Sequence, residues 1–104
     1  MHFVLLATHS AEVCPTSNSK VRDMLTQTAP EIPNIAEKAG VNIVAGPYVN
    51  REHITVAVVE ADTPDAVDQF LVESRLPQWN SVRVLPSLPM QQGLEELQAQ
   101  TPLF

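Results

Sequence analysis

Two histidines and the single cysteine are the side chains of this sequence best suited to hold a metal ion. Cys14 lies five residues after His9, and His53 follows much later in the chain. Two imidazoles and one thiolate form a borderline-soft ligand set that suits zinc, or copper in either oxidation state. Glu12 could add an oxygen ligand, or a water could leave one position open. The sequence has no closely spaced ligand motif, so this prediction requires that the fold bring the three residues together.

The same residues support a second hypothesis, an enzyme that needs no metal. His9 or His53 would act as the general acid or base on a small organic ligand. Cys14 would then be a nucleophile whose pKa a neighbouring histidine lowers. Without either chemistry, the histidines are strand ends in contact with water and Cys14 is a small buried hydrophobe. A structural or regulatory interaction module is a third class that the sequence leaves open.

The segments that must position these residues alternate between strand and helix patterns. Apolar runs rich in β-branched residues predict strands over residues 2–9, 41–49, 53–60 and 81–85. Apolar side chains at helical spacing predict a long first helical region, interrupted at Pro30 and ended by Gly40. Thr63 is a favourable cap for a second helix. The order β-α-β-β-α-β predicts an α+β fold of the ferredoxin-like type with a four-stranded antiparallel sheet.

This topology predicts that the candidate residues meet at one end of the sheet. Right-handed crossovers give the strand order 4-1-3-2, so the first and third strands are antiparallel neighbours. His9 ends the first strand and His53 begins the third, which would place their Cβ atoms roughly 5 Å apart. Cys14 lies in the loop that leaves this end. The fourth strand should bring Gln78 and Trp79 to the same place, where they could support the ligands or line a pocket.

The two faces of the predicted sheet are both apolar. We expect the bulkier and more uniform set to face the helices, namely Val4, Leu6, Ile54, Val56 and Val58. Phe3, Leu5 and Val59 would then form a bare apolar face, which usually indicates a partner surface. Two such sheets packed about a two-fold axis would bury it and give a homodimer. The enclosed space could also take a small apolar ligand.

At the level of architecture, the chain resembles the dimeric α/β-barrel superfamily, which includes muconolactone isomerases, small-quinol monooxygenases and haem-degrading monooxygenases. The resemblance covers most of the chain and implies a homodimer, possibly a higher oligomer. It would make the metal-independent alternative an isomerase or monooxygenase type of enzyme with its acid/base histidine in the barrel lumen. No catalytic motif of these families is present, so no functional residue is carried over. No organic cofactor is indicated.

Three further regions carry weaker expectations. Tyr48 and Arg51 flank the predicted hairpin next to His53 and could hydrogen-bond an anionic ligand. His2 lies at the opposite end of the first strand from His9, and we leave it out of the site. Residues 87–104 are expected to form a C-terminal extension with a short helix, packing on the domain or across the dimer.

Length and charge set the remaining bounds. A chain of 104 residues predicts a single domain spanning residues 1–104. The net charge of −6 and the lack of a Lys/Arg cluster argue against nucleic acid and anionic membranes as partners. The apolar runs are too short to cross a bilayer, and the first residues do not resemble a secretory signal. One cysteine fits a reducing compartment, so we expect a cytoplasmic protein.

Overall fold

The structure is a computed structural model that describes residues 1–103. The strands and α-helices are β1 His2–Thr8, α1 Ser19–Thr28, α2 Ile32–Ala39, β2 Asn42–Tyr48, β3 Ile54–Glu60, α3 Pro64–Ser74, β4 Ser81–Ser87 and α4 Met90–Ala99. Three short 3₁₀ turns connect them: η1 Ala11–Val13, η2 Ala29–Glu31 and η3 Leu76–Gln78. The predicted order of elements is therefore confirmed, with the first helical region split into α1 and α2.

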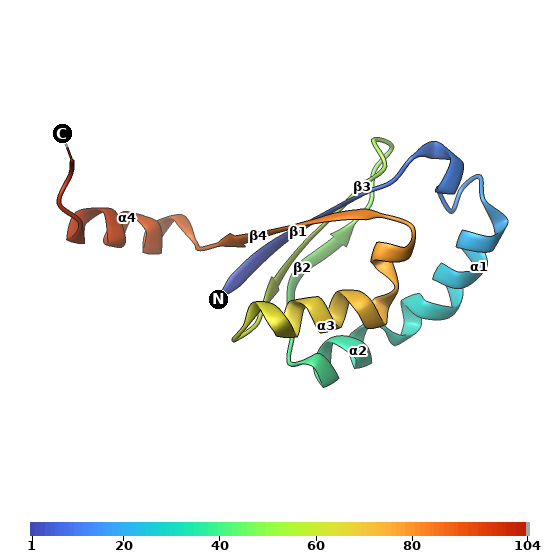
Figure 1. The fold of residues 1–104 in the computed structure, drawn as a ribbon, viewed down its shortest axis with the longest axis horizontal. Helices are drawn as coiled ribbons and strands as arrows, with labels where there is room; N and C mark the ends of the chain where they lie inside the picture. Colours follow the sequence, from blue (N-terminus) through green and yellow to red (C-terminus); the bar gives the residue numbers. More distant parts are fainter. Residues whose placement is uncertain (104) are drawn as a thin grey trace.

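The sheet has the predicted strand order. Its four strands are antiparallel neighbours in the order β2-β3-β1-β4. Helices α2 and α3 lie on one side of this sheet, and α1 lies beyond one end of its strands (Figure 1). The fold is thus a two-layer α+β arrangement, while the dimeric barrel stays a prediction.

Local capping explains where the helices begin and end. The Asn18 side chain accepts a hydrogen bond from the Val21 N–H at the start of α1, and Thr63 does the same for Ala66 at the start of α3. At the end of α2, Gly40 adopts a left-handed conformation with φ 78°, which glycine adopts without steric cost. These caps fix the helices that cover the sheet.

The face of the sheet that packs on the helices is the opposite of the one we expected. Phe3 and Val59 are fully buried and Leu5 is nearly so. They form one core with buried residues of the helices and their connections: Ala36, Ala39, Val41, Ala61, Val67, Phe70 and Leu71. The expectation that Phe3, Leu5 and Val59 form a bare face is therefore wrong.

The packing of the helices explains this reversal. On the core face, Ala7 and Ala57 are small, and the cavity they line is also lined by Phe70, Leu71 and Leu76. Small strand residues leave room for large helical ones, so complementary volumes rather than the bulk of the strand decide which face is covered. The bulkier set lies on the other face, half-buried, and consists of Val4, Leu6, Ile54, Val56 and Val58. The homodimer stays a prediction, and the face that we expected it to use is covered by the helices of the same chain.

Both edge strands contain a proline. In β2, Pro47 lies where the pairing with β3 shifts register, as the sequence predicts for an edge strand or bulge. Gly46 beside it has φ 84°, and a Cβ there would lie 2.6 Å from the Val56 carbonyl oxygen. In β4, the strand predicted over residues 81–85 is longer than expected, because its pairing with β1 includes Pro86 and continues to Ser87. An edge strand tolerates proline because the groups on its outer side have no partner strand.

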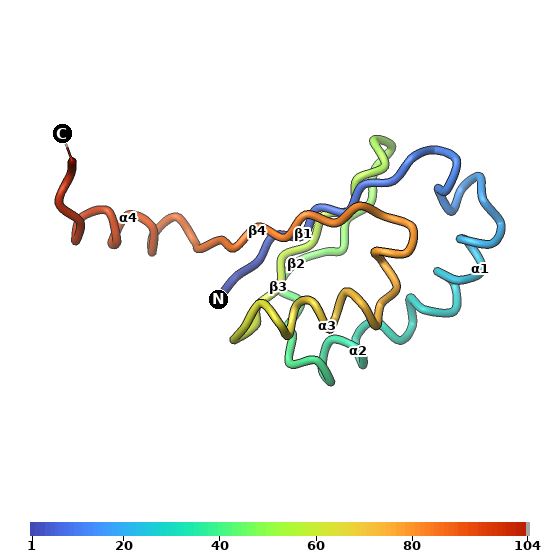
Figure 2. The backbone as a smooth tube through the Cα atoms, viewed as in Figure 1, coloured from blue at the N-terminus to red at the C-terminus, as the bar shows by residue number. Residues whose placement is uncertain are grey.

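The C-terminal part of the chain leads away from the two layers. Figure 2 shows the backbone leaving β4 and continuing into α4 beyond the end of the sheet. None of the residues of α4 is buried, and Leu94 and Leu97 are more than half exposed. Its packing across a dimer stays a prediction, and Phe104, the last residue of the predicted extension, lies outside the described residues. Among residues 1–103, no helix is long and apolar enough to cross a membrane.

Candidate metal centre

His9 and His53 lie side by side, as the strand order predicts. The pairing of β1 with β3 ends at Thr8 opposite Ile54, and the His9 N–H then donates to the His53 carbonyl oxygen at 3.2 Å. Their ring centroids are 5.2 Å apart, and the rings meet edge to face at 68°. The two imidazoles therefore come from residues that flank adjacent strands, His9 just after β1 and His53 just before β3, at the same end of the sheet.

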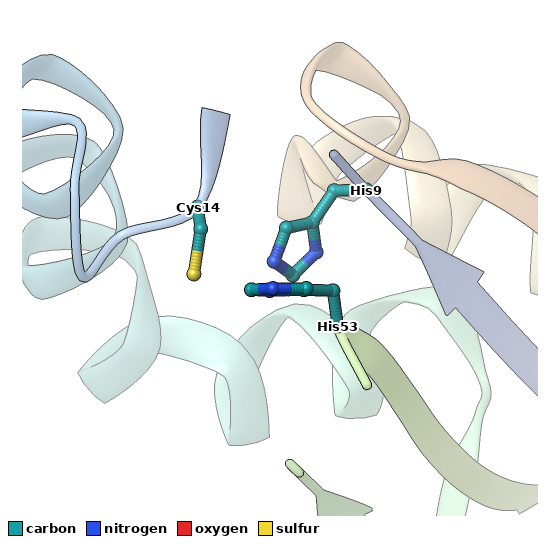
Figure 3. Close-up of side chains that lie close together, drawn as sticks. All are labelled: His9, Cys14 and His53. Atoms are coloured by element: carbon teal, nitrogen blue, oxygen red, sulfur yellow. The ribbon is translucent and has the colours of Figure 1, made fainter. Parts of the chain in front are cut away.

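The loop between β1 and α1 brings Cys14 to these histidines. Its backbone is fixed because the N–H groups of Ser17 and Asn18 donate to the Cys14 carbonyl oxygen at 2.9 and 2.8 Å. Figure 3 shows the sulfur directed toward the gap beside the two rings. One ligand atom from each of the three residues lies within 4.8 Å of the others. The sequence-predicted residues thus converge into a group that could hold a metal ion.

Asn80 fixes the orientation and tautomer of His9. The Asn80 amide Nδ2 donates to the Leu76 carbonyl oxygen at 3.1 Å, which leaves its Oδ1 to accept a hydrogen bond from His9 Nδ1 at 2.9 Å. With the proton on Nδ1, Nε2 carries a free lone pair. That Nε2 is buried and has no hydrogen-bond partner among the described residues. This is the arrangement of a metal-ligating histidine held by a second hydrogen bond.

Asn80 is absent from the residues predicted from the sequence, although the strand pairing contains the signal for it. In the pairing of β1 with β4, Thr8 lies opposite Ser81, so the next pair outward is His9 and Asn80. The neighbouring Trp79, which was predicted to lie near this end, packs its ring 5.0 Å from the His9 ring centroid. The segment just before β4 therefore contacts His9 on two sides.

His53 occupies an unusual backbone conformation. Its φ is 60°. Among the described residues, His53 is one of two non-glycine residues with a positive φ. The left-handed region costs most L-residues roughly 1–2 kcal/mol, although histidine visits it more often than most. Such conformations concentrate at functional sites, where the surrounding structure enforces them. Here the conformation accompanies the turn that directs the ring toward His9.

The thiol of Cys14 is held in a setting that favours its thiolate. The Thr16 hydroxyl, 3.0 Å from the sulfur, contributes most to lowering the pKa of Cys14, to about 6. The Thr16 backbone lowers it further, while burial of the sulfur opposes this effect. Hydrogen bonds from His9 and His53 lower it as well when the ring nitrogen that faces the sulfur carries a proton. The thiolate is the form of cysteine that binds metals.

The other residues named from the sequence lie outside this group. Glu12 and Gln78 are exposed in the 3₁₀ turns η1 and η3. Tyr48 is 63% exposed at the end of β2, and Arg51 is exposed in the hairpin. None of the four lines the cavity of about 250 Å³ beside the three candidate ligands, whose walls include Leu25, Val49 and Trp79.

The spacing of the three ligand atoms can be compared with that of a tetrahedral metal site. With zinc–nitrogen and zinc–sulfur bonds of about 2.0–2.3 Å, tetrahedral ligand atoms lie about 3.5 Å apart. The group would close by about 1 Å from its 4.8 Å span, a small side-chain movement. Three protein ligands leave the fourth position free for water or substrate. The residues present therefore fit zinc or copper.

Comparison with known proteins adds no functional assignment. No protein-family model matches the chain, and a search of curated proteins finds no match. The function of this chain is therefore inferred from the geometry and chemistry of the site.

Proposed function

We propose that this protein is a small transition-metal-binding domain that holds zinc or copper between His9, Cys14 and His53. The observation that carries the proposal is the buried Nε2 of His9, which has no partner among the described residues while Asn80 holds the other ring nitrogen. A buried acceptor without a partner costs about 1–3 kcal/mol, so folded proteins rarely leave one in place. A metal ion satisfies this nitrogen together with the neighbouring sulfur and the second imidazole.

The ligand set also favours a site with an accessible metal. Structural zinc sites are closed by four protein ligands, whereas sites with three keep a position open for exchange. The thiolate and imidazoles are softer ligands than the oxygen groups that calcium and magnesium prefer, which argues for zinc or copper. The metal would polarise or bind a small molecule at the open position, and this chain would supply the ligands and the hydrogen bond from His9 to Asn80.

Metal analysis tests the proposal directly. Protein purified without a chelator is expected to contain close to one zinc or copper ion per chain by elemental analysis. Copper(II) loading should produce a thiolate-to-copper absorption band, which Cys14→Ser removes. His2→Ala is the matched control, because His2 lies at the other end of β1 and pairs with Glu60. Folded protein that contains no metal and binds neither ion would refute the proposal.

A second candidate function is a metal-independent enzyme in which His9 or His53 acts as a general acid or base. The observation that favours it is the cavity of about 250 Å³ that both histidines and Cys14 line. In that case the chelator-treated protein would retain its activity, and a His9 substitution would abolish it with the fold intact. If the activity depends on the metal, chelator treatment and the Cys14→Ser substitution should each abolish it.

A further inference from the structure

A second cavity lies close to the candidate metal centre. It measures about 350 Å³, and its walls come from α1, η2, α2, β2, β3 and the segment before β4. Typical lining residues are Ala29, Ile32, Pro33, Ile43 and Leu76. A cavity of about 150 Å³ lined by apolar side chains is large enough for benzene. The space here is therefore sufficient for an organic ring with substituents.

The two cavities adjoin each other. Leu25, Val49, Thr55 and Trp79 line both the cavity beside the metal ligands and the second, more apolar one. Trp79 also contacts His9, with its ring 5.0 Å from the imidazole. A molecule in the apolar cavity would therefore extend along Trp79 toward His9 and Cys14.

The charges around this space define what it can bind. Among the described residues that line either cavity, none is Lys, Arg, Asp or Glu. A carboxylate or phosphate in the apolar part would lose its hydration without gaining a counter-charge, which is costly. The Asn50 amide is already engaged, since its oxygen accepts from Glu52 and Ile54 and its nitrogen donates to the Ile54 carbonyl. Among the described residues, the buried side-chain nitrogen that has no hydrogen-bond partner is His9 Nε2, which lies at the metal end.

We propose that the joined cavities bind a small, neutral, mainly apolar organic molecule, with a ring packed against Trp79 and a polar atom directed toward the His9, Cys14 and His53 group. This inference rests on the proposed function in one respect: the polar atom would occupy the open position of the metal. Binding of the apolar part depends on the cavity alone, so it can be tested without metal.

The test compares two para-substituted toluenes on chelator-treated, folded protein. p-Cresol is neutral, and p-toluate carries a carboxylate in place of the hydroxyl. Trp79 is the only tryptophan of the chain, so its emission, together with calorimetry, reports binding. We expect p-cresol to bind at least tenfold more tightly than p-toluate and to slow alkylation of Cys14. Equal affinities, or p-cresol binding that leaves Cys14 alkylation unchanged, would overturn the inference.

Two variants separate the cavity from the metal site. Ala29→Phe fills the second cavity at a residue that does not line the first, so p-cresol affinity should fall at least tenfold while metal affinity stays the same. Ala99→Phe in α4 is the matched control. Val49→Arg, at a position 81% exposed, brings a cation to both cavities and should reverse the preference toward p-toluate. An unchanged preference in Val49→Arg would contradict the inference.

These outcomes also separate this inference from the proposed function. If the protein binds neither zinc nor copper but still prefers p-cresol over p-toluate, only the metal proposal is refuted. Full metal occupancy with no selectivity between the two probes would refute the ligand proposal alone.

Discussion

A histidine begins β1 and another follows its last residue, and the two side chains have different neighbours. His2 lies opposite Glu60 of β3, and its Nε2 is 3.3 Å from a Glu60 carboxylate oxygen. The side chains of the pair are 27% and 45% exposed, so water reaches both. At the other end, the neighbours of His9 are another histidine and Asn80, and one of its ring nitrogens is buried without a partner among the described residues.

The difference shows that the cross-strand neighbours decide what a histidine does. A carboxylate neighbour in contact with water gives an exposed polar contact, which contributes little to stability. An amide that accepts from Nδ1, with a thiol and a second imidazole on the other side, gives a prepared ligand. Residue type and strand are the same, so substitutions at the two ends test the neighbours directly.

The largest contrast is expected for removal of each histidine in turn. His9→Ala should weaken zinc or copper binding by more than about 100-fold, because a direct ligand contributes more than its hydrogen-bonded support. His2→Ala should leave affinity unchanged. Competition with a chromophoric chelator measures both, and equal affinities for the two variants would remove the distinction between the strand ends.

The support from Asn80 should be visible as a smaller loss. Asn80→Ala removes the acceptor that holds the Nδ1 proton of His9, so metal affinity should fall about 10–100-fold. Asn80→Asp keeps an acceptor at that place and should stay much closer to the parent protein. If the Asn80→Ala and Asn80→Asp variants bind the metal with equal affinity, Asn80 does not orient His9.

The backbone of His53 predicts an effect on stability that runs against ordinary glycine substitution. At φ 60°, glycine is free of the steric cost that alanine bears, so His53→Gly should be about 1 kcal/mol more stable than His53→Ala. Both should lose the metal. Denaturant unfolding of the metal-free variants measures the difference, and a more stable alanine variant would show that the left-handed conformation is not retained.

The reactivity of Cys14 should follow its thiolate. Because the thiolate is the nucleophile, alkylation of chelator-treated protein should rise with pH and reach its midpoint near the pKa of about 6 rather than near 9.0. A thiolate of low pKa is a weaker nucleophile, so the net gain in rate at neutral pH is only a few-fold. Thr16→Val removes the largest stabilising contact and should raise the midpoint. Iodoacetamide labelling across pH checks both, and a midpoint that Thr16→Val leaves in place would contradict the role of Thr16.

The smallest effect is expected at the His2 end. Glu60→Gln removes the charge from an exposed histidine–carboxylate contact, so the free energy of unfolding should fall by less than about 0.5 kcal/mol. Metal affinity should not change. A loss of several kcal/mol in the free energy of unfolding, measured with denaturant, would mean that the contact between His2 and Glu60 stabilises the fold strongly. The contrast between the two ends of β1 would then not hold.

Much of the frame that positions the site follows from the sequence alone. The order of the elements, the cap at Thr63 and the end of α2 at Gly40 are encoded locally, in hydrophobic periodicity and in side chains that satisfy free backbone groups. The pairing of His9 with His53 follows from that order, because antiparallel neighbours place the end of one strand beside the start of the next.

The tertiary structure decided what those local signals leave undetermined. Both faces of β1 and β3 are apolar, so only the fit of Phe70 and Leu71 against small residues such as Ala7 and Ala57 selects the buried face. The distance from Cys14 to the histidines depends on a loop held by its own backbone hydrogen bonds. The role of Asn80 depends on the register of β4 against β1. Each of these depends on contacts between residues far apart in the chain or on loop conformation, which hydrophobic periodicity does not encode.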